Sequence, residues 1–97
     1  LDYADPEIGK QITRQLDEIC SEYGIRYHEL RYRSTGSRVL VEVHLVFPYS
    51  ESLGRAHAIS TTIERRLPES VAIPLEVTTH LESLEDHDAI HAGREKL

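Results

Sequence analysis

Four of the six histidines in this 97-residue sequence lie in four different segments that have regular secondary-structure patterns. They are His28, His44, His57 and His80. The last belongs to Thr79-His80-Leu81-Glu82, and alternate residues of a strand share one face, so His80 and Glu82 can bind the same divalent ion. Imidazole and carboxylate groups are ligands that zinc accepts. The sequence therefore predicts a metal site that holds zinc or another divalent transition metal.

Such a site needs three or four donor atoms that converge at about 2.0–2.3 Å from the ion. Two adjacent strand ends and the start of a helix can provide this convergence. His44, His80 and Glu82 are the central candidates, while His57 and His28 can add a neighbouring ligand or hold a second ion. Any one of these histidines alone is more simply explained as a surface or core residue, but the set favours a metal site.

The composition limits the classes of function. With 97 residues and 39% apolar residues, the chain is long enough for one domain with a modest core. Its formal net charge of −6 tolerates cations and argues against nucleic acid as a partner. The single cysteine, Cys20, excludes a disulfide framework and a cysteine-rich zinc knuckle. No apolar run reaches the ~18 residues that a membrane span requires, so we expect a soluble chain. The start at Leu1 rather than Met is consistent with a fragment or a processed product.

Residues 5–23 carry the pattern of an amphipathic helix. Asp5 can cap it, Pro6 suits its first position and Gly24 can end it. One apolar stripe contains Ile8, Ile12, Leu16, Ile19, Cys20 and Tyr23. Cys20 is therefore expected to be a buried hydrophobic residue and is left out of the metal site.

Residues 25–33 and 39–47 predict a β-hairpin, since both are rich in β-branched, aromatic or apolar residues. The second strand is apolar on one face and mixed on the other, so we expect a central strand whose mixed face is covered by a dimer partner. A three-residue turn at Ser34-Thr35-Gly36 would pair Arg33 with Ser37 and place His28 diagonal to His44 on one face. A two-residue turn would place them on opposite faces. Gly36 in third place favours the first register.

A second helix is predicted from a cap at Ser50 or Ser52 to about Leu67, where Pro68 would end it. A third strand is predicted from about Val71 to Glu82, and Pro74 marks it as an edge strand. The order α-β-β-α-β then requires a right-handed crossover and a third strand parallel to the second. We expect a ferredoxin-like, metallochaperone-like α+β sandwich with a three-stranded mixed sheet.

The predicted domain covers residues 1–83, and residues 84–97 form an acidic tail. His87 and His91 are four residues apart in this tail, a spacing that can chelate metal on a helix, but a solvated tail is the simpler interpretation. Arg31, Arg33 and Arg38 are expected to be solvated or to form salt bridges rather than to bind phosphate. No nucleophile elbow, phosphate loop or His-Glu-x-x-His motif is present, so an enzyme is not expected.

An ordered set of short motifs resembles the cytoplasmic C-terminal domain of cation diffusion facilitator transporters, the zinc-transporter dimerisation domain. The motifs cover about residues 5–82: residues 28–33, Gly36-Ser37-Arg38-Val39, residues 41–45, Ala56-His57 and residues 79–82. This resemblance implies a non-enzymatic homodimeric module on the cytoplasmic side of the membrane, attached to a transmembrane domain that lies outside this chain. It implies metal ligands at His28, His44, His57, His80 and Glu82, and metal binding that tightens the dimer and regulates efflux.

Two positions depart from patterns of that family. Glu82 and Glu29 stand where some members have aspartate, which retains the charge and lengthens the reach of the carboxylate. The second interpretation is a freestanding metallochaperone-like or small-ligand interaction domain with incidental histidines. A third is an enzyme that uses His80 and Glu82 as base and acid; it would need an enclosing pocket that so thin a domain is not expected to form.

Overall fold

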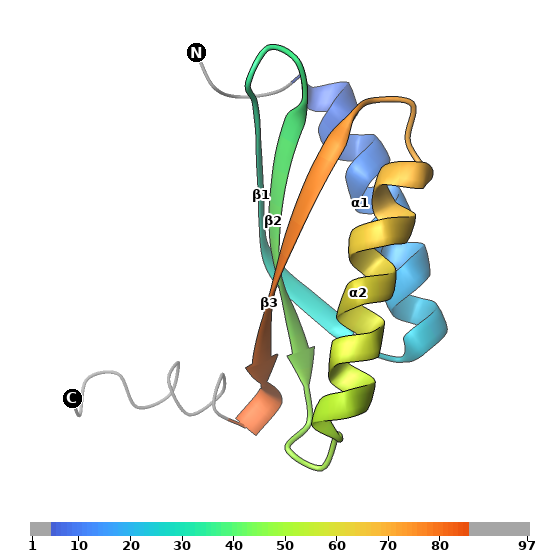
Figure 1. Cartoon of the computed structure of the whole chain (residues 1–97), viewed down its shortest axis with the longest axis vertical. Coiled ribbons are helices and arrows are strands. Elements are labelled where there is room, and N and C mark those ends of the chain that lie inside the picture. The colour runs from blue at the N-terminus through green and yellow to red at the C-terminus, as the bar shows by residue number, and fades with distance from the viewer. Residues whose placement is uncertain (1–4, 86–97) are drawn as a thin grey trace, which may run out of the picture.

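The computed structural model describes residues 5–85 as two helices and three strands. In chain order these are α1 (Pro6–Tyr23), β1 (Arg26–Ser34), β2 (Val39–Phe47), α2 (Leu53–Glu69) and β3 (Leu75–Ser83). The strands form one sheet in the order β1-β2-β3, with β1 antiparallel and β3 parallel to β2. Both helices cover the same face of the sheet (Figure 1). The predicted α-β-β-α-β order, the mixed sheet and the two-layer arrangement are confirmed.

The helices begin where the capping residues predict. The side chain of Asp5 accepts a hydrogen bond from the Glu7 N–H at 2.8 Å, and that of Ser52 accepts one from the Arg55 N–H at 3.0 Å. Gly24 ends α1 in a left-handed conformation with φ of 66°. Neither helix within residues 5–85 has the length and apolar character needed to cross a membrane.

Two predicted boundaries are wrong, and both lie next to prolines. Helix α2 continues through Pro68 to Glu69 rather than ending at Leu67, because a proline in the last turn removes only one intrahelical hydrogen bond. Strand β3 begins at Leu75 rather than Val71, because residues 71–73 bend before the chain joins the sheet. The carbonyl of Pro74 accepts a hydrogen bond from the Val39 N–H at 2.8 Å, just before the first paired residue. The prediction of an edge strand is confirmed.

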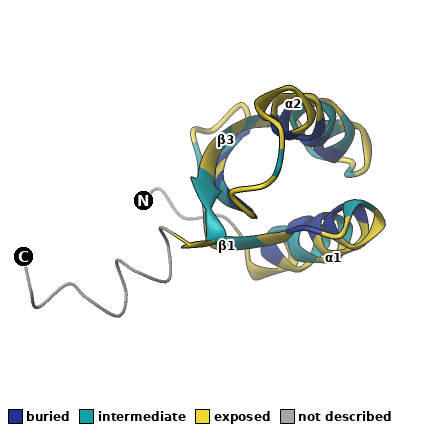
Figure 2. Cartoon of the chain, turned by 90° about the horizontal axis from the view of Figure 1, so that it is seen from below, coloured by how far each residue is buried: buried dark blue, intermediate teal, exposed yellow. Residues whose placement is uncertain are grey.

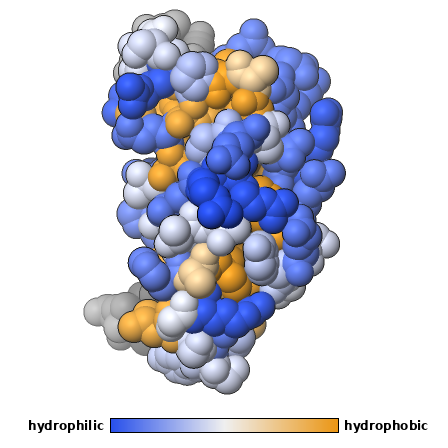
Figure 3. All heavy atoms as spheres, turned by 45° about the vertical axis from the view of Figure 1, so that its right-hand side comes forward, coloured by the Kyte–Doolittle hydropathy of each residue, from blue (hydrophilic) through white to orange (hydrophobic). Residues whose placement is uncertain are grey.

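The core lies between the sheet and the helices. Alternate residues of β2 point into it and are at most 4% exposed, and they meet buried residues of α1 and α2: Val39, Val41, Val43, Leu45, Phe47, Ile12, Leu16, Ile19, Ile59, Ile63 and Leu67. Figure 2 shows the buried residues on the facing sides of the two layers. On the helix side, apolar surface remains visible between polar groups (Figure 3). Burial of each large aliphatic side chain contributes about 1.5–3 kcal/mol, so this inner face stabilises the fold.

The hairpin turn differs from the predicted one. Thr35 N–H donates to Arg38 O at 2.9 Å, which leaves Gly36 and Ser37 as a two-residue turn, and Gly36 has a φ of 98°. A glycine at the first position of a two-residue turn suits the twist of the strands. Arg33 accordingly pairs with Leu40 rather than with Ser37.

A two-residue turn alone would place His28 and His44 on opposite faces of the sheet, but a β-bulge in β1 reverses this effect. Arg31 is paired with Glu42 and His28 with His44, so Glu29 and Leu30 together oppose one residue of β2. Because a shift of one residue moves a side chain to the other face of a sheet, the bulge brings His28 onto the same face as His44. The two histidines do share a face, as predicted, but they are direct partners and the bulge is the cause.

Candidate metal centre

One histidine from each strand lies at the same level on the sheet face that the helices leave open. His28 is the partner of His44 across β1 and β2, and His44 is the partner of His80 across β2 and β3. The ring centroids of His28 and His44 are 5.2 Å apart, and those of His44 and His80 are 4.9 Å apart. These distances match the spacing of neighbouring strands, which is about 4.8 Å. We call these three residues the histidine row.

Glu82 joins the row from β3, two residues after His80. Its Oε2 contacts Nε2 of His28 and lies 3.5 Å from Nδ1 of His44. Each of these three side chains offers one ligand atom, and the three atoms all lie within 4.8 Å of one another. His28, His44 and Glu82 therefore form a three-ligand cluster, which draws one residue from each strand.

The cluster is partly shielded from solvent, with side chains that are 25–27% exposed. Within residues 5–85, Nδ1 of His44 is buried and has no hydrogen-bond partner, and the carboxylate oxygen of Glu82 lies near it without forming such a bond. A buried polar atom without a partner costs about 1–3 kcal/mol. A metal ion would take up the free lone pair. Two imidazoles and a carboxylate are donors of the zinc type, so the residues fit such an ion.

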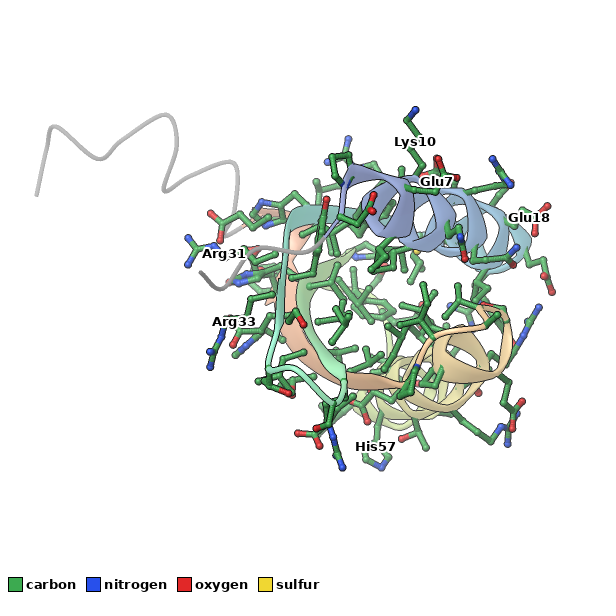
Figure 4. All side chains as sticks on the ribbon, turned by 90° about the horizontal axis from the view of Figure 1, so that it is seen from above. Glu7, Lys10, Glu18, Arg31, Arg33 and His57 are labelled. Atoms are coloured by element: carbon green, nitrogen blue, oxygen red, sulfur yellow. The ribbon has the colours of Figure 1, made fainter. Side chains whose placement is uncertain are left out.

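The other predicted ligands lie at different distances from this cluster. His80 stands next to His44 in the row, is about half exposed, and has its Nε2 3.7 Å from Oε1 of Glu42. His57 is exposed on α2 and points away from the molecule (Figure 4), so one copy of the chain does not bring it to the cluster. His87 and His91 lie outside the described residues.

Two carboxylates near the row were not among the predicted ligands. Oε2 of Glu29 lies 3.4 Å from Nε2 of His44, and Glu42 lies beside His80. The alternation of β2 already places Glu42 on the face of His44. Glu29 had no such signal, because strict alternation places neighbours in a strand on opposite faces and only the bulge changes this.

The arginines of the hairpin lie near acidic residues of the sheet. Arg38 forms the expected salt bridge, with its Nη1 2.8 Å from Oε1 of Glu76. Arg31 and Arg33 point outward from the sheet (Figure 4) and border a shallow hollow of about 360 Å³ that Glu42 and Glu76 also line. The hollow therefore has charges of both signs.

Several solved structures that are similar to this chain come from metal transporters. The structure of CzrB, a candidate zinc transporter, is 29% identical, with a TM-score of 0.75 over 82% of this chain and 96% of that chain. Its zinc form is 27% identical, with a TM-score of 0.77 over 87% of this chain and 93% of that chain. The metal-bound C-terminal domain of the CzcD transporter from Thermotoga maritima is 18% identical, with a TM-score of 0.68 over 84% of this chain and 94% of that chain, and supports the fold alone.

The sequence comparisons agree with the structural ones. An uncharacterised transporter, sll1263, of Synechocystis sp. strain PCC 6803 is 35% identical over 65 residues, which are 67% of this chain. The chain spans about a fifth of the length of that relative, 21%. Residues 4–84 match the family described as the cytoplasmic domain of cation efflux proteins, which are transporters rather than enzymes. The resemblance found in the sequence motifs is therefore confirmed, and the chain belongs to the family of cytoplasmic domains of cation efflux proteins.

Proposed function

We propose that the domain binds a zinc-type divalent ion through His28, His44 and Glu82, and that this binding stabilises a pair of copies and regulates the transporter to which the domain belongs. The convergence of three ligand atoms from three strands carries the proposal. The zinc form of CzrB, with a TM-score of 0.77, supports it.

The cluster needs only small movements to bind. Ligand atoms around one zinc ion are about 3–4 Å apart. Oε2 of Glu82 and Nδ1 of His44 already have such a separation, at 3.5 Å, whereas the direct contact of Glu82 with Nε2 of His28 must open for an ion to enter. His80 is the neighbour from which we expect a fourth ligand or part of a second site, since its ring lies 4.9 Å from that of His44. We assign any contribution of His57 to the contact between copies, because it is exposed on α2.

Charge explains why metal would favour pairing. Two copies with a formal charge of −6 each carry −12 together, and every divalent ion removes two units of this repulsion. Metal shifts the population toward the paired arrangement only by its higher affinity for that arrangement. In a single copy Glu82 contacts His28 directly, so the ligands are not yet arranged around an ion, which agrees with this requirement.

We place part of the pairing contact at the end of the sheet beside the cluster. Three large hydrophobic side chains are exposed there, Tyr49 by 65%, Leu53 by 79% and Leu81 by 42%. They line a hollow of about 200 Å³ that Glu82 also lines, so the apolar surface is continuous with the cluster.

Leu53→Glu should leave α2 intact, because an acidic residue suits the first turn of a helix, and should weaken the dimer about tenfold or more. Analytical ultracentrifugation of the two proteins checks this.

The first experiment is a calorimetric titration of the metal-free domain with zinc, with size followed by light scattering. Saturable binding and a shift toward the dimer are expected for the wild type. A His44→Ala/His80→Ala variant should lose both, because it removes two of the three imidazoles in the row. Thr78→Ala is the matched control, since Thr78 is exposed on the same strand, two residues before His80. Equal weak binding by all three proteins would reduce the domain to a dimerisation module with incidental histidines.

A further inference from the structure

The β-bulge in β1 holds Glu29 in an unusual backbone conformation. Its φ is 53°, in the left-handed region that non-glycine residues seldom occupy, and residues there store strain of about 1–2 kcal/mol. Glu29 is exposed, so packing of its own side chain does not explain the conformation. The bulge does have two results at the metal centre: it turns His28 to the open face and leaves the carboxylate of Glu29 beside His44.

The two nitrogens of His44 face different carboxylates. Nε2 lies 3.4 Å from Oε2 of Glu29, while Nδ1 lies 3.5 Å from Oε2 of Glu82, inside the cluster. A neutral imidazole has one N–H and one lone pair, and the nitrogen that carries the proton is set by its hydrogen-bond partner. Metal-binding histidines commonly donate the other N–H to a carboxylate, which orients the ring.

We infer that Glu29 is a positioning residue of the metal centre: it accepts the Nε2–H of His44 and thereby leaves the Nδ1 lone pair directed toward His28 and Glu82. The inference rests on the proposed metal-binding function. It accounts for the buried Nδ1 atom that has no hydrogen-bond partner within residues 5–85, because that atom is the one kept free for the ion.

Glu42 offers an internal comparison. Glu42 stands beside His80 as Glu29 stands beside His44, but its Oε1 lies 3.7 Å from Nε2 of His80, against 3.4 Å for the contact between Glu29 and His44. The side chain of Glu42 is also slightly more exposed, 54% against 48% for Glu29. It also occupies a regular position of β2, paired with Arg31, without a bulge. We therefore expect Glu42→Gln to weaken zinc binding less than the corresponding change at Glu29.

The test uses substitutions that separate the carboxylate from the backbone. Glu29→Gly removes the carboxylate and suits the left-handed conformation, so the free energy of unfolding should stay equal or rise. Zinc affinity, measured by calorimetry, should fall about tenfold or more. Glu29→Asp keeps a carboxylate and tolerates the conformation, so it should recover part of the affinity. Nitrogen-15 NMR of the metal-free domain should show His44 protonated on Nε2 in the wild type and should show this preference lost in Glu29→Gly.

The outcomes distinguish this inference from the proposed function. Wild-type affinity and an unchanged His44 tautomer in Glu29→Gly would overturn the inference while zinc binding by the wild type stands. Loss of affinity that accompanies a loss of folding stability, with no recovery in Glu29→Asp, would assign Glu29 a merely structural role and also overturn it. Absence of zinc binding in the wild type would contradict the proposed function, and the tautomer of His44 in the metal-free protein would still decide whether Glu29 orients the ring.

Discussion

The two faces of β2 differ in burial and in polarity. On the inner face, Val41, Val43 and Leu45 are at most 2% exposed and pack against both helices. On the outer face, Glu42 is exposed and His44 is partly exposed, with an unpartnered buried nitrogen among residues 5–85. From Val41 to Leu45, successive residues of β2 thus alternate between buried residues that stabilise the fold and two polar residues of the outer face, one of which has a buried nitrogen without a hydrogen-bond partner within residues 5–85.

We therefore expect that the candidate site does not hold the domain together. The helices supply the core from one side, so side chains on the open face can be arranged for binding at some cost in stability. Substitutions on the two faces should therefore have effects of opposite kind, which measurements on the metal-free domain can reveal.

The largest effect is expected on the inner face. Leu45 is fully buried, and Leu45→Ala removes its contacts and leaves a cavity, so the free energy of unfolding should fall by about 2–5 kcal/mol. Urea denaturation in the presence of a chelator measures this. A loss under 1 kcal/mol would show that the helices do not pack on β2 as described.

The reactivity of the Cys20 thiol tests whether the apolar face of α1 is buried. Burial, assisted by the nearby Asp17 carboxylate, raises the pKa of the Cys20 thiol to about 11. At pH 8 the reactive thiolate should therefore be more than about 100-fold scarcer than in an exposed cysteine, and the rate of reaction with a disulfide reagent should fall accordingly. The rate should increase as the pH approaches 11, and the urea-unfolded chain serves as the reference. Rapid reaction of the folded domain at pH 8 would contradict the burial of this helix face.

An intermediate effect is expected where α2 meets the edge of the sheet. Oε2 of Glu64 accepts hydrogen bonds from the Thr79 hydroxyl at 2.6 Å and from the Thr79 N–H at 3.2 Å. Glu64→Gln replaces a charged acceptor by a neutral one, so we expect a loss of about 1–2 kcal/mol in the free energy of unfolding. Glu69→Gln, at the exposed end of the same helix, is the control. Equal stability of the two variants would show that the contact does not support β3.

The smallest effect, and the opposite sign, is expected on the outer face. His44→Leu removes the buried nitrogen that has no hydrogen-bond partner within residues 5–85 and adds apolar surface, so the metal-free domain should gain about 0.5–1 kcal/mol while zinc binding is lost. Urea denaturation of the dilute domain with a chelator measures the gain. A marked loss of stability would mean that His44 supports the fold as well as the site.

Local patterns predicted most of the fold. The Asp5 cap, Pro6 and the left-handed Gly24 bound α1 as expected, and the alternation in β2 predicted its inner and outer faces. These signals act over a few residues and are properties of the chain itself. The parallel placement of β3 followed from the handedness of the crossover. The predicted end of α2 near Pro68 and the predicted start of β3 near Pro74 were wrong. A proline restricts the backbone at and before its own position, but it does not determine which residue is the last of a helix or the first of a strand.

The candidate site was predictable in part. The positions of His44, His80 and Glu82 on one face followed from alternation, and the structure places them there, although their role as ligands stays a prediction. The position of His57 away from the cluster was not predictable. A residue at the edge of the apolar stripe of a helix can point either toward the sheet or away from it. The metal-binding role of His57 is likewise a prediction.

The residues that face the core, the order of the elements and the available donor groups could all be read from the chain, because periodicity and capping are short-range properties. The pairing of His28 with His44, and the position of Glu29 beside His44, depend instead on how the strands fit together in three dimensions. The two-residue turn at Gly36-Ser37 alone would have put His28 on the inner face. A bulge of one extra residue corrected the register, and its position depends on the fit of the whole strand against β2 and the core rather than on any local signal.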